Sequence, residues 1–339
     1  MTTPADQPVD VHAHFVTDHY VEAARSAGHH HPDGMSSWPR WDAAEHLRLM
    51  DRHGIRTAVL SISSPGTHFG DDEAARRLNR EVNEHGAAIS LRHRGRFGHF
   101  ASLPLPDVAG SLDELAYCLD VLGSDGVAVM SNTYGVYLGD PRYEPLWSEL
   151  DRRRAVVFVH PTSPSHAEAV DLDRPRPMLE FLFDSARAVS DLVFTGVFQR
   201  YPAIQWIITH GGGVLPLLAD RMELFRTLFA GTGPTDDTRS GVREQIGRVW
   251  FDMAGTPFPY QIPVLAGQFG TDRILYGSDY CWTPDVGIDA QIASLRKAEQ
   301  PAPYTWRTLT TRNAERLMPQ FATATPSSTQ ARTCEPSGA

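Results

Sequence analysis

The sequence predicts a single (β/α)8 barrel, and three observations support this fold class. Eight short apolar segments alternate with segments of helical periodicity within residues 1–319, and such alternation is typical of a parallel sheet. Eight strand–helix units are the number that closes a TIM barrel, which commonly runs to about 250 residues or more as one domain. Histidine or aspartate ends four of the predicted strands.

The predicted strands are short apolar runs, several of them rich in β-branched residues, as buried parallel strands are. In chain order they are Val9–His14, Thr57–Ile62, Arg96–Leu103, Gly126–Met130, Ala155–His160, Ile204–His210, Arg248–Met253 and Arg273–Asp279.

The predicted helices lie between these strands. In the first, Ala44, Leu47 and Met50 recur on one side and Gly54 ends the helix. Phe15–Arg40 before it is predicted to be irregular. The helices are Trp41–Gly54, Asp71–Ala88, one capped by Ser111 and running to Leu122, Tyr143–Arg153, Pro177–Gln199, one from Gly213 to about Phe229, Gln261–Phe269, 287–299 and 305–317.

Composition excludes several classes of protein. The net charge is −10 and Lys297 is the only lysine, so no basic surface for nucleic acid is expected. No apolar run approaches the roughly 20 residues of a membrane span. The three cysteines are widely spaced and the first residues are polar, which predicts a cytoplasmic protein. Residues 320–339 are rich in Ser, Thr, Pro and Ala, and we expect a disordered tail.

The first predicted strand ends in His12 and His14. Residues i and i+2 of a strand point to the same face, so both imidazoles are directed to one point. A divalent metal accepts histidine nitrogen at about 2.0–2.1 Å, which allows the pair to bind one ion. Taken alone, the pattern fits two ordinary histidines at a strand end equally well.

Three further polar residues stand at the ends of later strands: His160, His210 and Asp279. The carboxyl ends of barrel strands open on one face, where barrel enzymes place their chemistry. Each residue alone is explained by hydrogen bonding in the core, but packing does not easily explain the whole set. Nitrogen and oxygen donors without cysteine suit Zn²⁺ or Mn²⁺ in an open, catalytic site.

Several motifs resemble the amidohydrolase superfamily, specifically its ACMS-decarboxylase-like branch, which includes 6-methylsalicylate and γ-resorcylate decarboxylases. Matching stretches run from Val9 to about Met318. They are Val-Asp-Val-His-Ala-His, Val-Phe-Val-His-Pro, Thr-His-Gly-Gly-Gly and Tyr-Gly-Ser-Asp-Tyr, with Gly-Val-Tyr-Leu-Gly-Asp-Pro and Arg312-Asn313-Ala314.

The resemblance implies a ligand set and an assembly. His12, His14, His160 and Asp279 would bind one divalent ion, Zn²⁺ or alternatively Mn²⁺, with His210 beside it as a catalytic group. Many amidohydrolases bridge two metals with a strand-end lysine, but the only lysine here falls in a late helix, which favours one ion. A homodimer or a larger homo-oligomer is also implied.

Two reactions fit this ligand set. The first is non-oxidative decarboxylation of a small hydroxy-aromatic acid resembling 6-methylsalicylate, with Asp279 protonating the carbon that bears the carboxylate. The second is hydrolysis of an amide, ester or lactone by metal-activated water. The resemblance favours the first. A non-catalytic metal-binding module is a third alternative, although no partner-binding repeat or basic patch is visible.

Candidate substrate contacts are less well defined. Phe15, Met178, Phe181 and Trp282 are proposed walls of a dry site. The resemblance also implies that Arg221 is a substrate arginine donated across a dimer interface, with a surface salt bridge as the alternative. The stretch 175–181 is similar to the 6-methylsalicylate decarboxylases, which implies a small aromatic acid as substrate.

Overall fold

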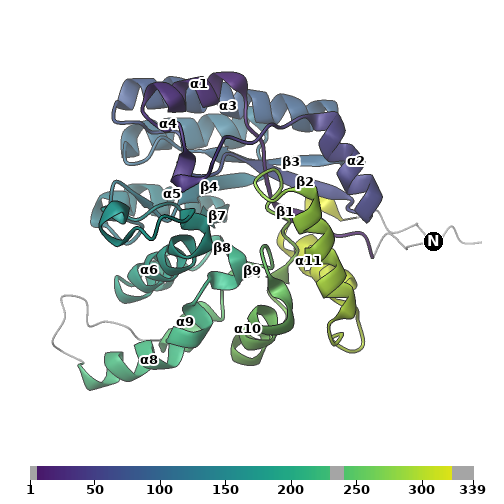
Figure 1. The fold of residues 1–339 in the computed structure, drawn as a ribbon. Helices are drawn as coiled ribbons and strands as arrows, with labels where there is room; N and C mark the ends of the chain where they lie inside the picture. The colour runs from purple at the N-terminus through teal and green to yellow at the C-terminus, as the bar shows by residue number, and fades with distance from the viewer. Residues whose placement is uncertain (1–5, 230–239, 323–339) are drawn as a thin grey trace, which may run out of the picture.

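A closed, parallel eight-stranded barrel forms the centre of the computed structural model, which describes residues 6–229 and 240–322 (Figure 1). Strand order follows the chain, and parallel bridges from Asp10 to Tyr276 and from Ala13 to Tyr280 close the barrel. The predicted fold class is therefore confirmed. The strands are β1 Val9–His14, β2 Thr57–Ser61, β3 Phe97–Ser102, β4 Gly126–Met130, β7 Val156–His160, β8 Gln205–Ile208, β9 Trp250–Asp252 and β10 Ile274–Leu275.

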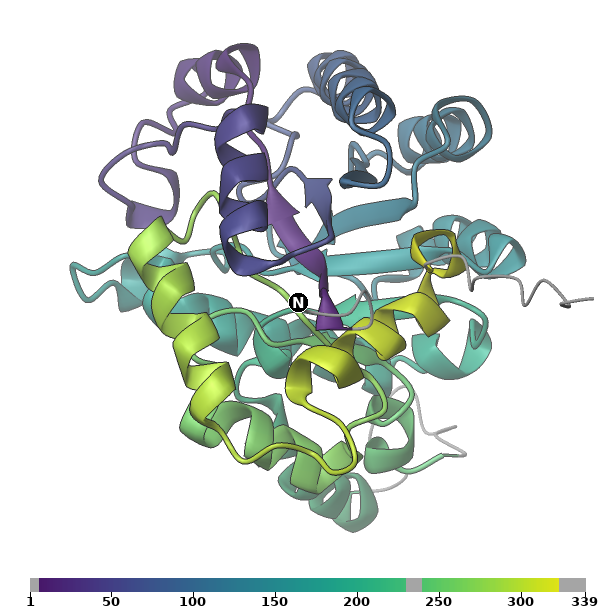
Figure 2. The same ribbon diagram turned by 90° about the vertical axis from the view of Figure 1, so that its right-hand side faces the viewer.

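Helices surround this barrel on its outside (Figures 1 and 2). A small hairpin, β5 Asn132–Thr133 and β6 Val136–Tyr137, follows β4. The helices are α1 Asp18–Ser26, α2 Ala43–His53, α3 Asp72–Arg92, α4 Val108–Tyr117, α5 Glu144–Arg153, α6 Glu180–Phe194, α7 Val197–Arg200, α8 Leu215–Leu228, α9 Val242–Ile246, α10 Ile262–Phe269, α11 Asp285–Lys297 and α12 Trp306–Leu317.

The barrel interior is a packed apolar core, closed at the amino-terminal ends of its strands. Val11, Phe100 and Phe158 belong to this core and are fully buried. Helix α12 crosses that end (Figure 2), where Ala314 and Met318 pack into the same cluster. The carboxyl ends of the strands are therefore the end left for chemistry.

Three sequence-based expectations about helices were wrong. The segment expected to be irregular contains α1, which begins after Thr17, whose hydroxyl accepts a hydrogen bond from the Tyr20 amide. The helix predicted over Pro177–Gln199 is two helices, because Gly196 between them adopts a left-handed conformation (φ 74°). In addition, Asp107 rather than Ser111 caps α4.

The described residues continue past 319, the end of the predicted barrel domain, to residue 322. Pro319–Phe321 form a short 3₁₀ turn, and the Arg56 guanidinium donates to the Phe321 carbonyl at 2.7 Å. The remainder of the predicted tail, 323–339, lies outside the described residues. Within the described ranges, no helix is long and apolar enough to cross a membrane.

Candidate metal centre

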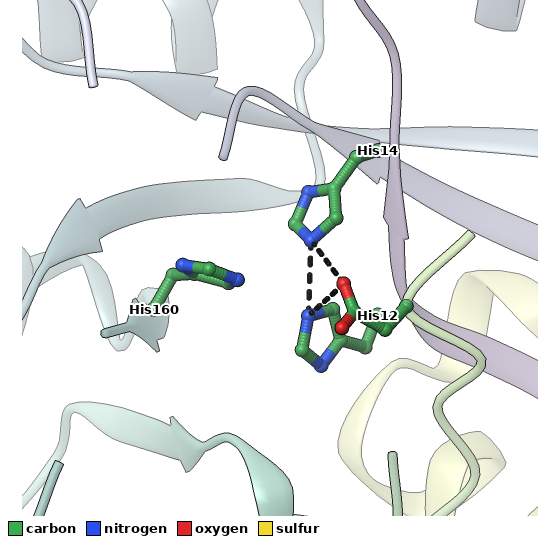
Figure 3. Close-up of side chains that lie close together, drawn as sticks. His12, His14 and His160 are labelled. Atoms are coloured by element: carbon green, nitrogen blue, oxygen red, sulfur yellow. Dashed lines mark hydrogen bonds and ion pairs between the residues drawn. The ribbon is translucent and has the colours of Figure 1, made fainter. Parts of the chain in front are cut away.

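The carboxyl end of β1 supplies two histidines that converge. His12 and His14 lie on the same side of the strand, are fully buried, and place their Nε2 atoms 3.0 Å apart. His160, at the end of β7, faces them (Figure 3), with its ring centroid 5.2 Å from that of His12 and 4.9 Å from that of His14.

Asp279, in the loop after β10, completes the cluster. Its Oδ1 atom lies 3.4 Å from His12 Nε2 and 3.2 Å from His14 Nε2. The donor atoms of His12, His14, His160 and Asp279 all lie within 4.8 Å of one another. Neighbouring ligands bound to one ion at about 2.0–2.1 Å are roughly 2.9–3.4 Å apart. The separations of 3.0, 3.2 and 3.4 Å among His12 Nε2, His14 Nε2 and Asp279 Oδ1 therefore fit a single divalent cation.

The outer nitrogens of the three histidines support the same conclusion. His12 Nδ1 lies 2.9 Å from Asp252 Oδ2, and His160 Nδ1 donates to the Pro161 carbonyl at 2.7 Å. His14 Nδ1 lies 3.0 Å from Ser61 Oγ. Acceptors at Nδ1 keep the proton there and leave Nε2 free to bind a metal, as in many metalloenzymes. The cluster therefore has the donor chemistry of a divalent-metal site.

Burial and charge shape the protonation of these groups. Burial lowers the pKa of His14, and lowers that of His160 well below its usual value, so both are in the neutral form that binds metal. Burial also opposes a charge on His12, but the carboxylates of Asp252 and Asp279 raise its pKa to about 10. The two carboxylates thus create a negative potential that attracts a cation to this point.

His210 lies beside the cluster, just after β8. Its Nε2 is 3.5 Å from Asp279 Oδ2, and its ring centroid is 5.0 Å from that of His12. The glycines after it allow a tight turn, because a Cβ at Gly213 would lie 2.2 Å from the Leu182 carbonyl oxygen. Both His210 and Asp279 have positive φ angles, of 52° and 60°. Such backbone strain clusters at functional sites.

Asp252 is a site residue that the sequence analysis missed. Besides contacting His12, it accepts hydrogen bonds at Oδ1 from the His210 and Ala254 amides, at 3.0 and 2.9 Å. One buried carboxylate thereby connects a candidate ligand to the candidate catalytic histidine. Its position at the carboxyl end of a predicted strand was a signal that could have revealed it.

A cavity of about 340 Å³ opens beside the cluster and is lined by His160, His210 and Asp279. Met178, Phe181 and Trp282, the other three candidate walls, also line it, and their contact with a substrate stays a prediction. Three lining residues have a buried polar atom without a hydrogen-bond partner among the described residues, which fits a site for a polar ligand. These atoms are His210 Nδ1, Gln261 Oε1 and Trp282 Nε1.

Two candidate substrate contacts lie elsewhere. Phe15 is fully buried and stacks on His85, so its expected role as a cavity wall was wrong. The reason is the alternation of the strand: Phe15 follows His14 and points away from the barrel interior. Arg221 lies on α8, exposed, with its guanidinium 4.7 Å above the Phe225 ring, and does not line the cavity of its own chain.

Comparison with known proteins identifies the family. The model of the amidohydrolase family matches residues 9–319, so this chain belongs to that family. Decarboxylase macB of Penicillium terrestre is 34% identical over 305 residues, covering 85% of this chain and 88% of the relative. The 6-methylsalicylic acid decarboxylase acuB of Aspergillus aculeatus is 32% identical over 302 residues, covering 87% of this chain and 89% of the relative.

A solved structure agrees with the fold. It is a dihydroxybenzoic acid decarboxylase from Polaromonas sp. JS666 with bound manganese and the inhibitor 2-nitroresorcinol. It matches with a TM-score of 0.80 over 94% of this chain and 98% of its own, at 24% identity. The family predicted from the motifs is thus confirmed by sequence, and the barrel by structure.

Proposed function

We propose that this protein is a metal-dependent, non-oxidative decarboxylase of a small hydroxy-aromatic carboxylic acid resembling 6-methylsalicylate. The observation that carries the proposal is the convergence of three histidines and Asp279 in one cluster, of which His160 and Asp279 line the adjoining cavity. That ligand set fits hydrolysis of an amide, ester or lactone as well. Decarboxylation is favoured because the two relatives described above, which match most of the chain, are named decarboxylases.

The proposed chemistry assigns a proton transfer to Asp279. When bound, the divalent cation supplies Lewis acidity and a fixed point for the substrate carboxylate and its ortho hydroxyl. The Asp279 carboxyl delivers a proton to the ring carbon that bears the carboxylate. The bond to that carboxylate then breaks, its electrons restore the aromatic ring, and CO₂ leaves.

His210 is proposed to hold and return the proton that Asp279 uses. Burial alone would raise the pKa of Asp279, but His12, His14 and His210 together hold it well below its usual range. The carboxyl therefore needs a neighbouring donor, and His210 Nε2 is 3.5 Å from its Oδ2. Phe181, which is buried and lines the same cavity, reduces the water that competes for the proton.

The resident ion is proposed to be Zn²⁺ or Mn²⁺. Three imidazole nitrogens and one carboxylate suit both ions. Because the Polaromonas enzyme holds manganese, Mn²⁺ is the first ion to test. Metal analysis of purified protein, followed by removal with a chelator and reloading with each ion, identifies the one that restores activity.

The decisive assay offers 6-methylsalicylate to the reloaded enzyme in D₂O. The proposal predicts CO₂ and 3-methylphenol, with one deuterium at the carbon that lost the carboxylate. Asp279→Asn should lower the rate by about 10²–10⁴-fold, the usual contribution of a general acid. Asp285→Asn is the matched control, because Asp285 lies at the surface in an ion pair with Arg52 and should leave the rate unchanged.

Two outcomes would overturn this proposal. A wild-type rate in Asp279→Asn would exclude Asp279 as the proton donor. Cleavage of an amide, ester or lactone by the reloaded enzyme, with no CO₂ from any hydroxy-aromatic acid, would establish the hydrolase instead.

We also propose that the chain forms a homodimer or a larger homo-oligomer through α8. Leu217, Leu224 and Leu228 recur at helical spacing and are 71%, 52% and 63% exposed. Arg221 lies in the same stripe, which supports its expected position at a subunit interface. Light scattering should give at least twice the chain mass, and Leu224→Glu should lower it. A monomeric wild-type protein would contradict the proposal.

A reducing, cytoplasmic location is proposed from the cysteines. Cys118 and Cys281 are buried free thiols, as is usual where disulfides are not formed. Fractionation of the source cells, with an antibody to the protein, tests this location; recovery with extracellular proteins would contradict it.

A further inference from the structure

The charges around the cavity are unevenly distributed. Among the described residues that line it are two carboxylates, Asp33 and Asp279, and neither a lysine nor an arginine. Asp279 belongs to the metal cluster, so Asp33 is the acidic residue that the proposed chemistry leaves unused. A carboxylate that lines a substrate cavity without a role needs an explanation, because burying a charge is costly.

Asp33 is held in place by the loops that follow β1 and β7. It is only 8% exposed and has a left-handed backbone (φ 51°). The Ser163 hydroxyl donates to its Oδ1, and Ser163 lies three residues after His160. The following residue, Gly34, packs against the backbone of Arg174 and Pro175, just before the stretch that carries the cavity wall Met178.

The second oxygen of Asp33 has no hydrogen-bond donor among the described residues. Arg176 is connected to Asp33 only through Ser163, because its Nη1 lies 3.5 Å from the Ser163 hydroxyl that donates to Asp33. The Nη2 atom of Arg176 lies 3.9 Å from Asp171 Oδ2. Asp33 lines the cavity, so its second oxygen is available to accept a hydrogen bond from a bound molecule. A hydroxyl on the substrate would satisfy it, whereas a second carboxylate there would meet a like charge.

We infer that Asp33 determines which acids this site accepts: monocarboxylates are accepted, a further ring hydroxyl facing Asp33 strengthens binding, and a second carboxylate is rejected. The inference rests on the proposed function, because it assumes that the reacting carboxylate occupies the metal cluster. With that end of the ring fixed, the far end is the part that can approach Asp33. The geometry thus indicates that Asp33 discriminates between neutral and anionic substituents on the part of the ring opposite the reacting carboxylate.

A matched series of acids tests this inference. Salicylate, 2,4-dihydroxybenzoate and 2-hydroxyterephthalate differ only at ring position 4, which carries hydrogen, hydroxyl or carboxylate. Dissociation constants and kcat/KM are measured for each acid on the metal-loaded wild type. The same three substituents are then compared at ring position 5, in case that position rather than position 4 faces Asp33. The dissociation constants do not require turnover, so they test Asp33 even if the reaction proves to be different.

The variant is Asp33→Asn, and its control is Asp173→Asn. Asparagine keeps an acceptor for Ser163 and tolerates the left-handed backbone. Asp173 has the same backbone conformation (φ 53°) but is exposed and does not line the cavity. Metal content and Tm should match the wild type in both variants, which confirms that the site is intact.

We expect the wild type to bind the hydroxyl acid best and the dicarboxylate worst. Two ratios of dissociation constants are compared: that of the hydroxyl acid to salicylate, and that of the dicarboxylate to salicylate. Asp33→Asn should bring each ratio closer to one by roughly tenfold, the difference between a charged and a neutral hydrogen bond. Asp173→Asn should leave both ratios unchanged. Ratios that are the same in Asp33→Asn as in the wild type would overturn the inference. Failure of the wild type to release CO₂ from any acid, with the binding ratios as expected, would instead overturn the decarboxylase proposal.

Discussion

At the scale of single residues, the ligand cluster could be predicted because its side chains are unusual where they stand. Histidine or aspartate at the end of an apolar strand is conspicuous, and His12, His14, His160 and Asp279 were found in this way and lie together in the structure. Asp252 was missed although it also ends a strand, because its importance comes from a contact with His12, which is 240 positions away. The position of Asp252 near the end of a strand was a local signal, but its contact with His12 cannot be read from the local sequence.

Asp252 is the first residue whose substitution we predict. Asp252→Asn removes the negative charge that orients His12 and offsets the positive charge of the metal ion. Metal affinity should therefore fall by about 10–100-fold. Chelator competition on the purified variant measures that affinity. The change should appear in metal binding before it appears in the fold, because asparagine retains the shape of the side chain.

The control for Asp252 is another fully buried carboxylate. Asp184 accepts hydrogen bonds from Ser131, Asn132 and Tyr137, and is not among the cavity-lining residues. Asp184→Asn should lower Tm and leave metal affinity within a few-fold of the wild type. Equal metal affinity in Asp252→Asn and in the wild type would show that Asp252 does not support the centre.

At the scale of elements, alternating apolar and helical segments predicted all eight barrel strands, because buried parallel strands are continuous apolar runs. Helix limits were less predictable. The nine residues of α1 are too short for a clear periodic pattern, and the break at Gly196 within a long apolar pattern depends on one backbone angle. Close approaches between elements, such as that of Gly277 to β1, also depend on the folded arrangement.

Gly277, in the segment after β10, provides a prediction at this scale. A Cβ there would lie 2.8 Å from His12 Cβ and 3.1 Å from Asp252 Cβ, closer than real carbon atoms pack. Gly277→Ala should therefore displace His12, lower metal affinity by at least tenfold and destabilise the fold by about 1–3 kcal/mol. Chelator competition and thermal unfolding measure the two effects.

Gly267 in α10 is the matched control. A Cβ there meets no atom within 4 Å, and alanine is favoured over glycine inside a helix by roughly 0.5–1 kcal/mol. Gly267→Ala should raise Tm slightly and leave metal binding unchanged. If Gly277→Ala behaved in the same way, the close packing of β10 on β1 would not matter for the site.

At the scale of the whole molecule, the number of strand–helix units predicted a closed barrel. Because the carboxyl ends of barrel strands all open on one face, the position of the site could be predicted as well. The carboxyl-terminal boundary was harder to predict, because composition changes gradually from residue 320. In the structure Phe321 packs near Gly98, and Gln320 Nε2 donates to Asp125 at 3.0 Å. The end of α12 and the turn after it therefore belong to the barrel.

Two truncations test that boundary. A chain that ends at Met318 loses the contacts of Phe321 and should be less stable by roughly 1–3 kcal/mol. A chain that ends at Ala322 keeps them and should unfold at the same temperature as the full chain. Equal stability of the two truncated chains would show that the 3₁₀ turn contributes nothing to the fold.

The central claim is that side chains from β1, β7 and the segment after β10 bind one divalent cation at the mouth of the barrel. Anomalous X-ray diffraction from crystals of the manganese-loaded protein tests it most directly. We expect one strong peak within about 2.0–2.3 Å of a donor atom from each of His12, His14, His160 and Asp279. A map without a peak among these four side chains, or with His160 turned away from it, would show that they do not form one metal site.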